Sequence, residues 1–374
     1  MRALRKTLKS KCSRLWLPIL WRKYPHKRKK LAIFKPDGIG DFVLSSEAIR
    51  ALIEEQESGQ VSLIVSEEVQ SLAVRMFPRA EIITIVPGHA RPLQKMLGLL
   101  QLRRAVGKNA YNEVVCLRHY RTGYEEAILR AVHAGKLVLL PNQSRAAEGN
   151  ADAPARFRFA EVNQLRQEAN TPREWSFHAS VLSEALKRPI SAESLRPNWD
   201  KWERSVNMND RFLLVAPLAG RQIRDIPPRL VTAAASKASA NGMHHFVLTG
   251  SKAQSAQLSC YVSAIRHALP HSRIEVAHPH NLPAFVDLAA KAALVVTAES
   301  SAAHIATALD KPALVVIGGG HYGWFAPWRR SDKQVWLTNE LPCFDCSWHC
   351  RYPEPICITG LTAAQVEAAL PVAE

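Results

Sequence analysis

The stretch LAIFKPDGIGD, residues 31–41, indicates the fold class of this 374-residue chain. Four apolar residues without alternation predict a short strand buried on both faces, and the two glycines permit a tight turn after it. Residues 45–55 then carry apolar side chains spaced for one face of a helix. A buried strand, a glycine turn and a helix in this order open a βαβ unit of a parallel sheet.

The same alternation continues along the rest of the chain. Further strands are predicted at residues 61–65, 81–86, 113–117, 136–140, 212–216, 246–248, 274–277, 294–297 and 313–317, with helix-like stretches between them. Polar residues 142–174 interrupt the rhythm, and residues 188–210, which contain two prolines, suit a linker.

We therefore predict an α/β chain with two Rossmann-like, doubly wound domains facing across a cleft. A chain of 374 residues exceeds what one hydrophobic core usually organises. The predicted parts are a basic tail (1–30), an N-terminal domain (31–187), a linker (188–210) and a C-terminal domain (211–374). Ligands of such sheets bind at the carboxyl ends of the strands, so we expect the site in the cleft between the domains.

The positive charge of the chain is concentrated at its N-terminus. Residues 1–30 hold twelve Lys or Arg and no acid, and subtracting those twelve from the formal charge of +16 leaves +4 for the other 344 residues. A nearly neutral body disfavours nucleic-acid binding. The tail also contains LWLPILW, residues 15–21, and basic residues mixed with tryptophan suit an anionic membrane surface.

This apolar run is too short to span a bilayer, and it lacks the longer apolar core and cleavage site of a secretory signal. We therefore expect a cytoplasmic protein, peripheral on the inner face of the cytoplasmic membrane. The alternative is a solvated, frayed basic N-terminus without function.

Two carboxylates flank the glycines of the first turn. Asp37 and Asp41 lie where a phosphate-binding loop would not place negative charge, so the turn suits a different task. An ionised Asp41 at the start of a helix could accept a proton from a substrate hydroxyl. Alternatively, Asp41 merely caps that helix.

A second candidate site follows the strand predicted at residues 294–297. The stretch LVVTAESSAAHIA, residues 294–306, brings Glu299, Ser300 and Ser301 to the start of a helix, with His304 one turn further. Free backbone N–H groups at such a turn suit a diphosphate. The alternative is that an acid or hydroxyl caps the helix and His304 is a core histidine.

Three consecutive glycines, residues 318–320, follow the last predicted strand. They suggest a backbone that must leave room for a ligand. His321, directly after them, could bind phosphate or sugar, or could make a structural bond in its loop.

The chain has seven cysteines, an odd number that favours reduced thiols. Four of them fall within fifteen positions, at Cys343, Cys346, Cys350 and Cys357. This density suggests a structural zinc site. Buried unligated thiols and a redox pair are the alternatives.

Residues 35–44, KPDGIGDFVL, are similar to the N-terminal motif of glycosyltransferase family 9, the heptosyltransferase-like enzymes that include ADP-heptose:lipopolysaccharide heptosyltransferases. Residues 216–227 and 297–328 resemble two further family motifs in the same order. The resemblance implies a two-domain GT-B arrangement, with Asp41 as general base. It also implies that Lys35, Gly38 and Gly40 lie on the acceptor or phosphate side.

On the donor side the resemblance implies a nucleotide-sugar site in the C-terminal domain. Its residues would be Arg224, Gly250, Glu299, Ser300, Ser301 and His304. Arg224 stands where the family usually has Lys, Glu299 where it has Asp, and Ser301 where it has Gly. These departures leave the sugar and the nucleotide base unassigned.

Together these features predict an inverting, metal-independent glycosyltransferase. It would move a sugar, with heptose as one candidate, from a nucleotide diphosphate sugar to lipopolysaccharide or another lipid-linked envelope glycan. No cofactor would be required apart from this co-substrate. The alternative is a non-catalytic nucleotide-sugar or polyanion-binding protein at the membrane surface.

Overall fold

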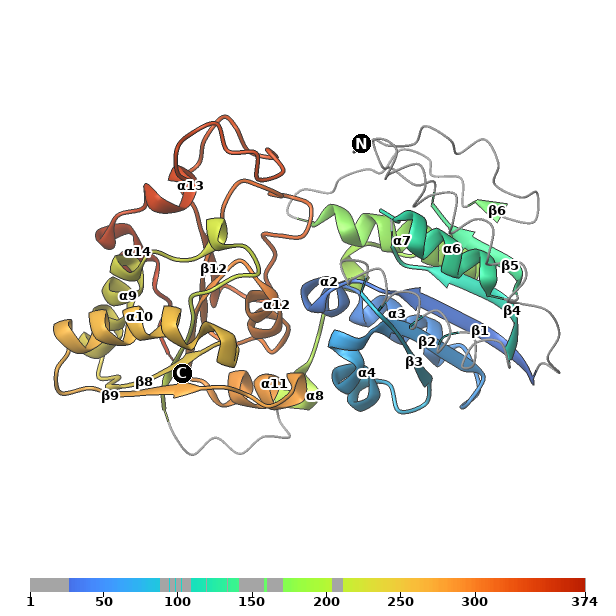
Figure 1. Cartoon of the computed structure of the whole chain (residues 1–374), viewed down its shortest axis with the longest axis horizontal. Coiled ribbons are helices and arrows are strands. Elements are labelled where there is room, and N and C mark those ends of the chain that lie inside the picture. The colour runs from blue at the N-terminus through green and yellow to red at the C-terminus, as the bar shows by residue number, and fades with distance from the viewer. Residues whose placement is uncertain are drawn as a thin grey trace. The chain divides into compact units, whose positions relative to one another are not determined.

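A computed structural model describes residues 27–87, 94, 98, 102, 109–118, 120–132, 134–140, 158–159, 171–203 and 211–373. Within these residues the chain forms two compact units, each built on a six-stranded sheet (Figure 1). All strand pairs in both sheets are parallel. The predicted α/β class with two Rossmann-like domains is confirmed.

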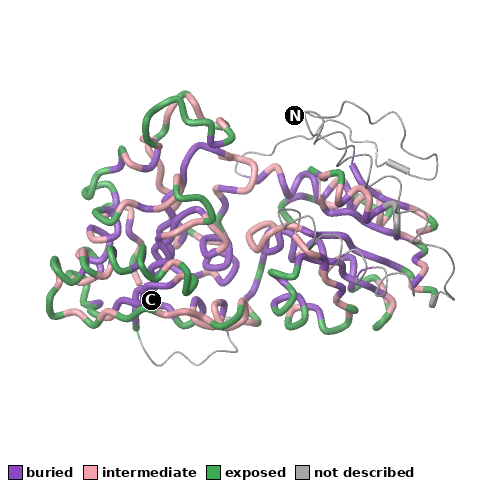
Figure 2. Tube along the Cα trace, viewed as in Figure 1, coloured by how far each residue is buried: buried purple, intermediate pink, exposed green. Residues whose placement is uncertain are grey.

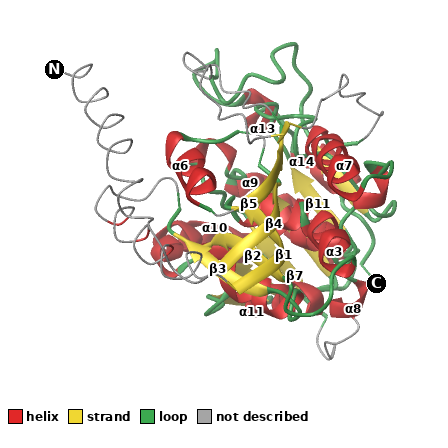
Figure 3. Ribbon diagram, turned by 90° about the vertical axis from the view of Figure 1, so that its right-hand side faces the viewer, coloured by secondary structure: helices red, strands yellow, loops and turns green. Residues whose placement is uncertain are grey.

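The first sheet has the order β3-β2-β1-β4-β5-β6, which Figure 3 shows from β3 to β5. Its strands are β1 (Lys27–Lys35), β2 (Val61–Ser66), β3 (Glu81–Ile85), β4 (Asn109–Cys116), β5 (Ala134–Leu139) and β6 (Arg158–Phe159). The helices of this part are α2 (Ile39–Leu44), α3 (Ser46–Glu54), α4 (Gln70–Met76), α6 (Gly123–Ala131) and α7 (Arg173–Leu186), with short 3-10 helices η1 (Glu67–Val69) and η3 (Glu193–Leu195).

The second sheet has the order β12-β11-β10-β7-β8-β9. Its strands are β7 (Leu213–Ala216), β8 (His245–Thr249), β9 (Arg273–Ala277), β10 (Leu294–Ala298), β11 (Ala313–Val316) and β12 (Gln334–Leu337). Its helices are α8 (Asp200–Glu203), α9 (Pro228–Ala240), α10 (Ser255–Ala268), α11 (Leu282–Lys291), α12 (Ser301–Ala308), α13 (Ile356–Thr359) and α14 (Ala363–Ala369), with η4 (Gln222–Arg224) and η5 (Lys252–Gln254).

Both sheets have the same strand order when each is numbered from its own first strand. In each, the chain moves outward from the first strand on one side, then returns to continue on the other side. The direction therefore reverses between β1 and β4 in the first sheet, and between β7 and β10 in the second. Ligands of such sheets bind outside the strand ends at this switch point.

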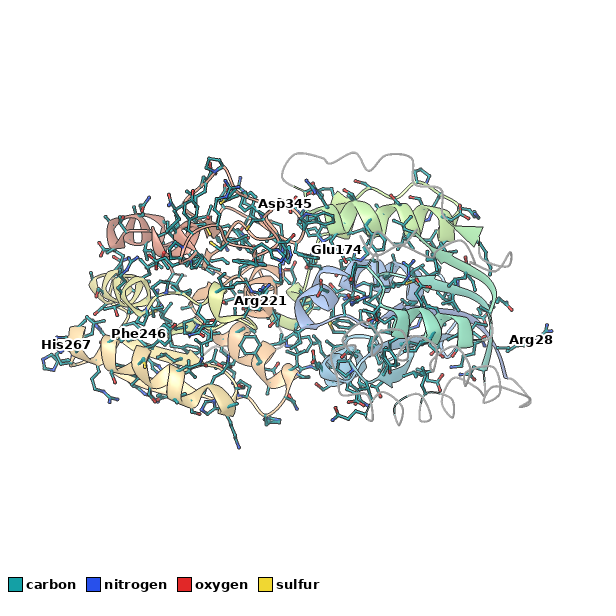
Figure 4. All side chains as sticks on the ribbon, turned by 45° about the horizontal axis from the view of Figure 1, so that its top comes forward. Arg28, Glu174, Arg221, Phe246, His267 and Asp345 are labelled. Carbon is teal, nitrogen blue, oxygen red and sulfur yellow. The ribbon has the colours of Figure 1, made fainter. Side chains whose placement is uncertain are left out.

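Largely apolar runs explain the buried strands. β2, β7 and β10 are buried along their whole length. Figure 2 draws buried residues, in purple, in the interior of each unit. Phe246, labelled in Figure 4, packs in the core of the second unit. Strands covered by helices on both faces need such runs.

The predicted boundaries differ from the structure in several places. β1 begins at Lys27, so the last four residues of the predicted tail are strand, and Lys29 pairs with Glu81 at 2.7 Å. Residues 1–26 lie outside the described part. The short β12 was not predicted, since its sequence, QVWL, lacks the apolar run of the other strands.

The predicted linker, residues 188–210, contains η3 and all of α8, and the two units divide within it, between Leu195 and Arg196. The first unit also takes Phe177–Leu195, whereas the start of α7, up to Ser176, belongs to the second.

Candidate functional site

The switch point of the first sheet carries a cluster of charged side chains. Lys35 ends β1, and Arg118 follows β4, the neighbouring strand. The Lys35 ammonium donates to the Leu117 carbonyl at 2.9 Å and lies 3.1 Å from an Asp37 carboxylate oxygen. Arg118 pairs with the other oxygen of Asp37. Asp37 is therefore held between two cations.

In this geometry the Lys35 side chain makes contacts that hold the fold together. Its side chain is 1% exposed, and its contacts with Asp37 and Leu117 join the end of β1 to the turn and to the end of β4. The assignment of Lys35 to the acceptor or phosphate side stays a prediction.

Arg118 was missed by reasoning from the sequence. Burial opposes its charge, but the carboxylates of Asp37, Glu125 and Asp41 outweigh burial and raise its pKa. Its guanidinium also lies 3.3 Å from Glu125. The available signal was its place directly after the strand predicted at residues 113–117.

Asp41 lies inside α2 and is half-buried. The N-cap of α2 is Gly38, so the alternative that Asp41 caps this helix is wrong. The Asp41 carbonyl accepts a hydrogen bond from the Ser45 hydroxyl at 2.7 Å, and that hydroxyl lies 3.3 Å from Nε2 of the buried His178. These contacts fix the backbone of a six-residue helix that would be unstable alone.

The glycines of this turn do not need the left-handed region. The described glycines with positive φ are Gly59, Gly242 and Gly323, so neither Gly38 nor Gly40 is among them. A Cβ added to Gly38 would lie 3.9 Å from an Asp41 carboxylate oxygen, an ordinary contact. The absence of a side chain there leaves space beside the Asp41 carboxylate.

The switch point of the second sheet brings together four of the predicted donor residues. Glu299 follows β10, and Ser300 caps α12, accepting a hydrogen bond from the Ala302 amide at 3.3 Å. Ser301 is the first residue of α12. The Arg224 guanidinium lies 3.7 Å from Glu299, which is 6% exposed.

His304 lies within the same helix and is buried. Burial, and to a lesser degree the positive charge of Arg224, lower its pKa to about 3. The Trp328 indole N–H donates to Nδ1 of His304 at 2.9 Å, and the two rings stack at an interplanar angle of 7°. Because Nδ1 accepts, the ring proton lies on Nε2, and His304 is a neutral hydrogen-bond donor.

His321 lies near two arginines and one carboxylate. Burial, Arg224 and Arg221 lower its pKa, whereas Asp345 acts in the opposite direction. Arg221 and Asp345 are labelled in Figure 4. Arg221, Arg224 and neutral His321 form a donor-rich region suited to an anion.

Gly250 follows β8, the neighbour of β7 in the sheet, and its carbonyl lies 2.8 Å from Nδ1 of His278. A Cβ there would lie 3.2 Å from both Gln254 and Leu258. The structure gives no direct contact between Gly250 and the other predicted donor residues within the described part.

The three glycines at 318–320 have a different role from the one predicted. A Cβ at Gly318 would lie 2.7 Å from the Trp348 ring, one at Gly320 would overlap the same ring, and one at Gly319 would overlap the Phe344 ring. The space that these glycines leave is therefore filled by the protein itself. The prediction that it serves a ligand is wrong.

Trp348 and Phe344 come from the segment that holds the four clustered cysteines. All four cysteines line one pocket, which these two aromatic rings also line. All six cysteines that the structure describes are free thiols. In that part of the chain, no three His, Cys, Asp or Glu side chains are arranged to hold a metal ion. The structural zinc stays a prediction.

Comparison with known proteins agrees with this geometry. Residues 177–351 match the family model described as glycosyltransferase family 9 (heptosyltransferase). This part of the chain belongs to glycosyltransferase family 9. The chain is accordingly a glycosyltransferase. Comparison with the curated proteins gives no match.

Solved structures of family 9 enzymes share the fold over nearly the whole length. The Escherichia coli ADP-heptose lps heptosyltransferase II has a TM-score of 0.65 at 15% identity, covering 91% of this chain and 97% of that one. A family 9 glycosyltransferase from Veillonella parvula gives 0.67 at 13% identity, covering 93% and 97%. E. coli heptosyltransferase WaaC, solved with ADP-2-deoxy-2-fluoro heptose, gives 0.63 at 14% identity, covering 91% and 98%.

These likenesses establish the GT-B type of fold with two parallel sheets. Among the described helices, none combines the length and the apolar character that crossing a bilayer requires.

Proposed function

We propose that this glycosyltransferase moves a heptosyl group from ADP-heptose to a lipopolysaccharide or another envelope glycan acceptor, with inversion and without a catalytic metal. The observation that carries this proposal is the pair of equivalent switch points. One holds Asp41, a half-buried carboxylate, and the other holds Arg224 and the start of α12. The family match supports this donor, as do the solved structures of E. coli WaaC with ADP-2-deoxy-2-fluoro heptose and with ADP.

In the proposed reaction, Asp41 takes the proton of the acceptor hydroxyl as its oxygen forms a bond to the anomeric carbon. The bond from that carbon to the diphosphate oxygen breaks, and ADP leaves with the electron pair. Attack from the face opposite the leaving group inverts the anomeric centre.

The leaving diphosphate gains negative charge, and the second unit offers groups that stabilise it. Arg224 can pair with two phosphate oxygens, and the start of α12 adds the positive end of a helix dipole. His304 would contribute its Nε2–H as a neutral donor, and Ser300, Ser301, Glu299 and Gly250 would line the donor. Lys35, Gly38 and Gly40 would shape the acceptor side.

We further propose that the N-terminal tail holds the enzyme at the inner face of the cytoplasmic membrane, where a lipid-linked acceptor is found. The predicted domain division, with the acceptor side before residue 188 and the donor side after residue 210, is part of this proposal.

Replacement of Asp41 tests the catalytic role. Asp41→Asn should lower kcat by on the order of 10²-fold or more, because proton removal is lost, while ADP affinity is retained. The measurement is transfer from ADP-heptose to a purified lipopolysaccharide core acceptor, with calorimetric ADP binding alongside. Glu54→Gln, at an exposed carboxylate of α3, is the matched control and should keep full activity.

An unchanged kcat in Asp41→Asn would remove Asp41 from the mechanism. ADP binding by the unmodified protein without transfer to any envelope acceptor would favour the alternative of a non-catalytic nucleotide-sugar-binding protein.

A further inference from the structure

The segment between β12 and α13 carries two aromatic side chains, Phe344 and Trp348, that have no role in the reaction proposed above. Three of its residues, Asp345, Ser347 and Trp348, have positive φ values of 64°, 51° and 62°. Residues other than glycine adopt the left-handed region of positive φ at an energetic cost. Surrounding contacts must therefore hold this segment in its conformation.

Those contacts come from the glycine triplet. The Asp345 amide donates to the Gly319 carbonyl at 2.7 Å, and the Ser347 amide donates to the Gly320 carbonyl at 2.8 Å. Trp348, which is 6% exposed, packs where side chains at Gly318 and Gly320 would otherwise lie. The triplet therefore fixes the position of one indole ring.

That ring lies against the cation of the donor region. The Arg224 guanidinium carbon lies 5.8 Å from the centroid of Trp348, within the range of a cation–π contact. The same guanidinium also lies 3.7 Å from a carboxylate oxygen of Glu299. Arg224 is thus held between an aromatic face and a carboxylate, and its side chain is 21% exposed.

We propose that Trp348 is a positioning residue that holds the Arg224 guanidinium in place for the diphosphate of a nucleoside diphosphate ligand. This inference rests on the donor-binding role of Arg224 in the proposed function. A free arginine side chain loses rotamer freedom when it binds, and that loss weakens affinity. An arginine already held against an indole ring loses less, so the ligand binds more tightly.

The segment with the clustered cysteines thereby gains a role in the donor site that needs no chemistry at sulfur. The ring of Trp348 also lies 6.3 Å from that of His321, at an interplanar angle of 87°. One side chain of this segment therefore contacts two of the groups that surround the proposed phosphate position.

Calorimetric binding of ADP to the full chain tests the proposal. Trp348→Leu should weaken ADP binding about 3- to 10-fold, the range expected for losing a partly buried cation–π contact. Trp348→Phe keeps an aromatic face and should recover most of the affinity. Adenosine, which has no phosphate, should bind all three proteins alike, a pattern that a general loss of structure would not give.

A second variant reaches the same ring without changing it. Gly320→Ala should displace Trp348, because the new Cβ would overlap the ring, and should weaken ADP binding in the same way. Gly123→Ala is the matched control, since a Cβ there would meet nothing within 4 Å. Gly320→Ala keeps the test decisive if Trp348→Leu does not fold.

Arg224→Gln separates this inference from the function on which it rests. If Arg224→Gln weakens ADP binding but Trp348→Leu and Gly320→Ala do not, the positioning role is refuted and the donor assignment stands. If Arg224→Gln leaves ADP binding unchanged, the donor assignment of Arg224 fails and the inference fails with it.

Discussion

His304 shows how one buried hydrogen bond decides what a histidine can do. Nδ1 accepts from the Trp328 indole, and burial lowers the pKa of the ring to about 3. His304 is therefore neutral across the physiological range, which excludes a role as a cation toward phosphate. The alternatives of a buried core histidine and a donor-site residue both agree with this geometry, because Nε2–H is still a donor.

The titration of His304 predicts a pH dependence of stability. Its folded pKa lies below the unfolded value of about 6.5, so its contribution is complete above pH 6.5 and is lost as the pH falls toward 3. The urea midpoint of unfolding should therefore decrease as the pH is lowered from 6.5 toward 3. Protonation linked to His304 should lower the free energy of unfolding by up to about 1.4 kcal/mol per pH unit. His304→Gln, which cannot titrate, should show a shallower fall.

His267→Gln is the control for this measurement, because His267 is exposed on α10 (Figure 4). It should keep the pH dependence of the unmodified protein. An equal slope in His304→Gln would mean that His304 does not control acid stability.

At the level of single residues, the sequence predicted Asp41, Arg224 and Ser300 in segments that follow buried strands, and they lie in α2, in η4 and at the N-cap of α12, after β1, β7 and β10. It could not predict that Lys35 is buried against Leu117, because that contact depends on the register between β1 and β4. Arg118 was missed for the same reason, since its partner Asp37 lies 81 positions away.

At the level of elements, α2 depends on contacts outside itself. It has only six residues, and the Ser45 hydroxyl both donates to the Asp41 carbonyl and meets His178 of α7. A helical period read from the sequence reveals neither contact. The sequence predicted a helix only from residue 45 onward, whereas the structure has α2 before it and α3 after it.

Removal of the Ser45 hydroxyl should therefore affect catalysis more than donor binding. Ser45→Ala removes one polar contact of the buried His178 and should lower the free energy of unfolding by about 1–3 kcal/mol. We expect a lower kcat with ADP affinity unchanged, because α2 carries Asp41 and lies in the first unit. Denaturant unfolding and kinetics of the same preparation measure the two effects.

Ser259→Ala is the comparison, since its hydroxyl makes a similar bond to the carbonyl four residues earlier, at 3.0 Å, on the exposed part of α10. Unfolding and kcat should both stay near those of the unmodified protein. A kcat in Ser45→Ala as high as in Ser259→Ala would show that the hydroxyl does not position Asp41.

The glycine triplet marks a limit of sequence reasoning at the level of elements. Glycine shows that something must come close to the backbone, but it does not say what. Here the close groups are Phe344 and Trp348, rings from a segment more than twenty positions further along the chain. Only the packed structure distinguishes such rings from a ligand.

For the whole molecule, the fold class was predictable because alternating buried strands and helices recur in both halves. The equal strand order of the two sheets was not, since periodicity does not give the lateral order of strands. The order matters because it gives each unit a switch point of its own, with a carboxylate at one and an arginine at the other.

The basic tail gives a prediction that the structure sharpens. Because β1 begins at Lys27, a deletion should stop at residue 26 to keep the strand intact. Removing residues 1–26 should weaken binding to vesicles that contain phosphatidylserine, with about 1 kcal/mol lost for each basic residue that lies near the surface. Binding to neutral vesicles and to an oligonucleotide should change little, and undiminished sedimentation with the anionic vesicles would contradict membrane attachment by the tail.

The path of the chain between its two units limits where recombination between related genes can exchange one unit without disrupting the other. The chain enters the second unit before Ser176, returns to the first for Phe177–Leu195, and leaves it again at Arg196. A single crossover between codons 44 and 178 would therefore combine α2 from one parent with His178 from the other, although both belong to the first unit. Natural hybrids that combine the first unit of one enzyme with the second unit of another should have their junctions just beyond codon 195.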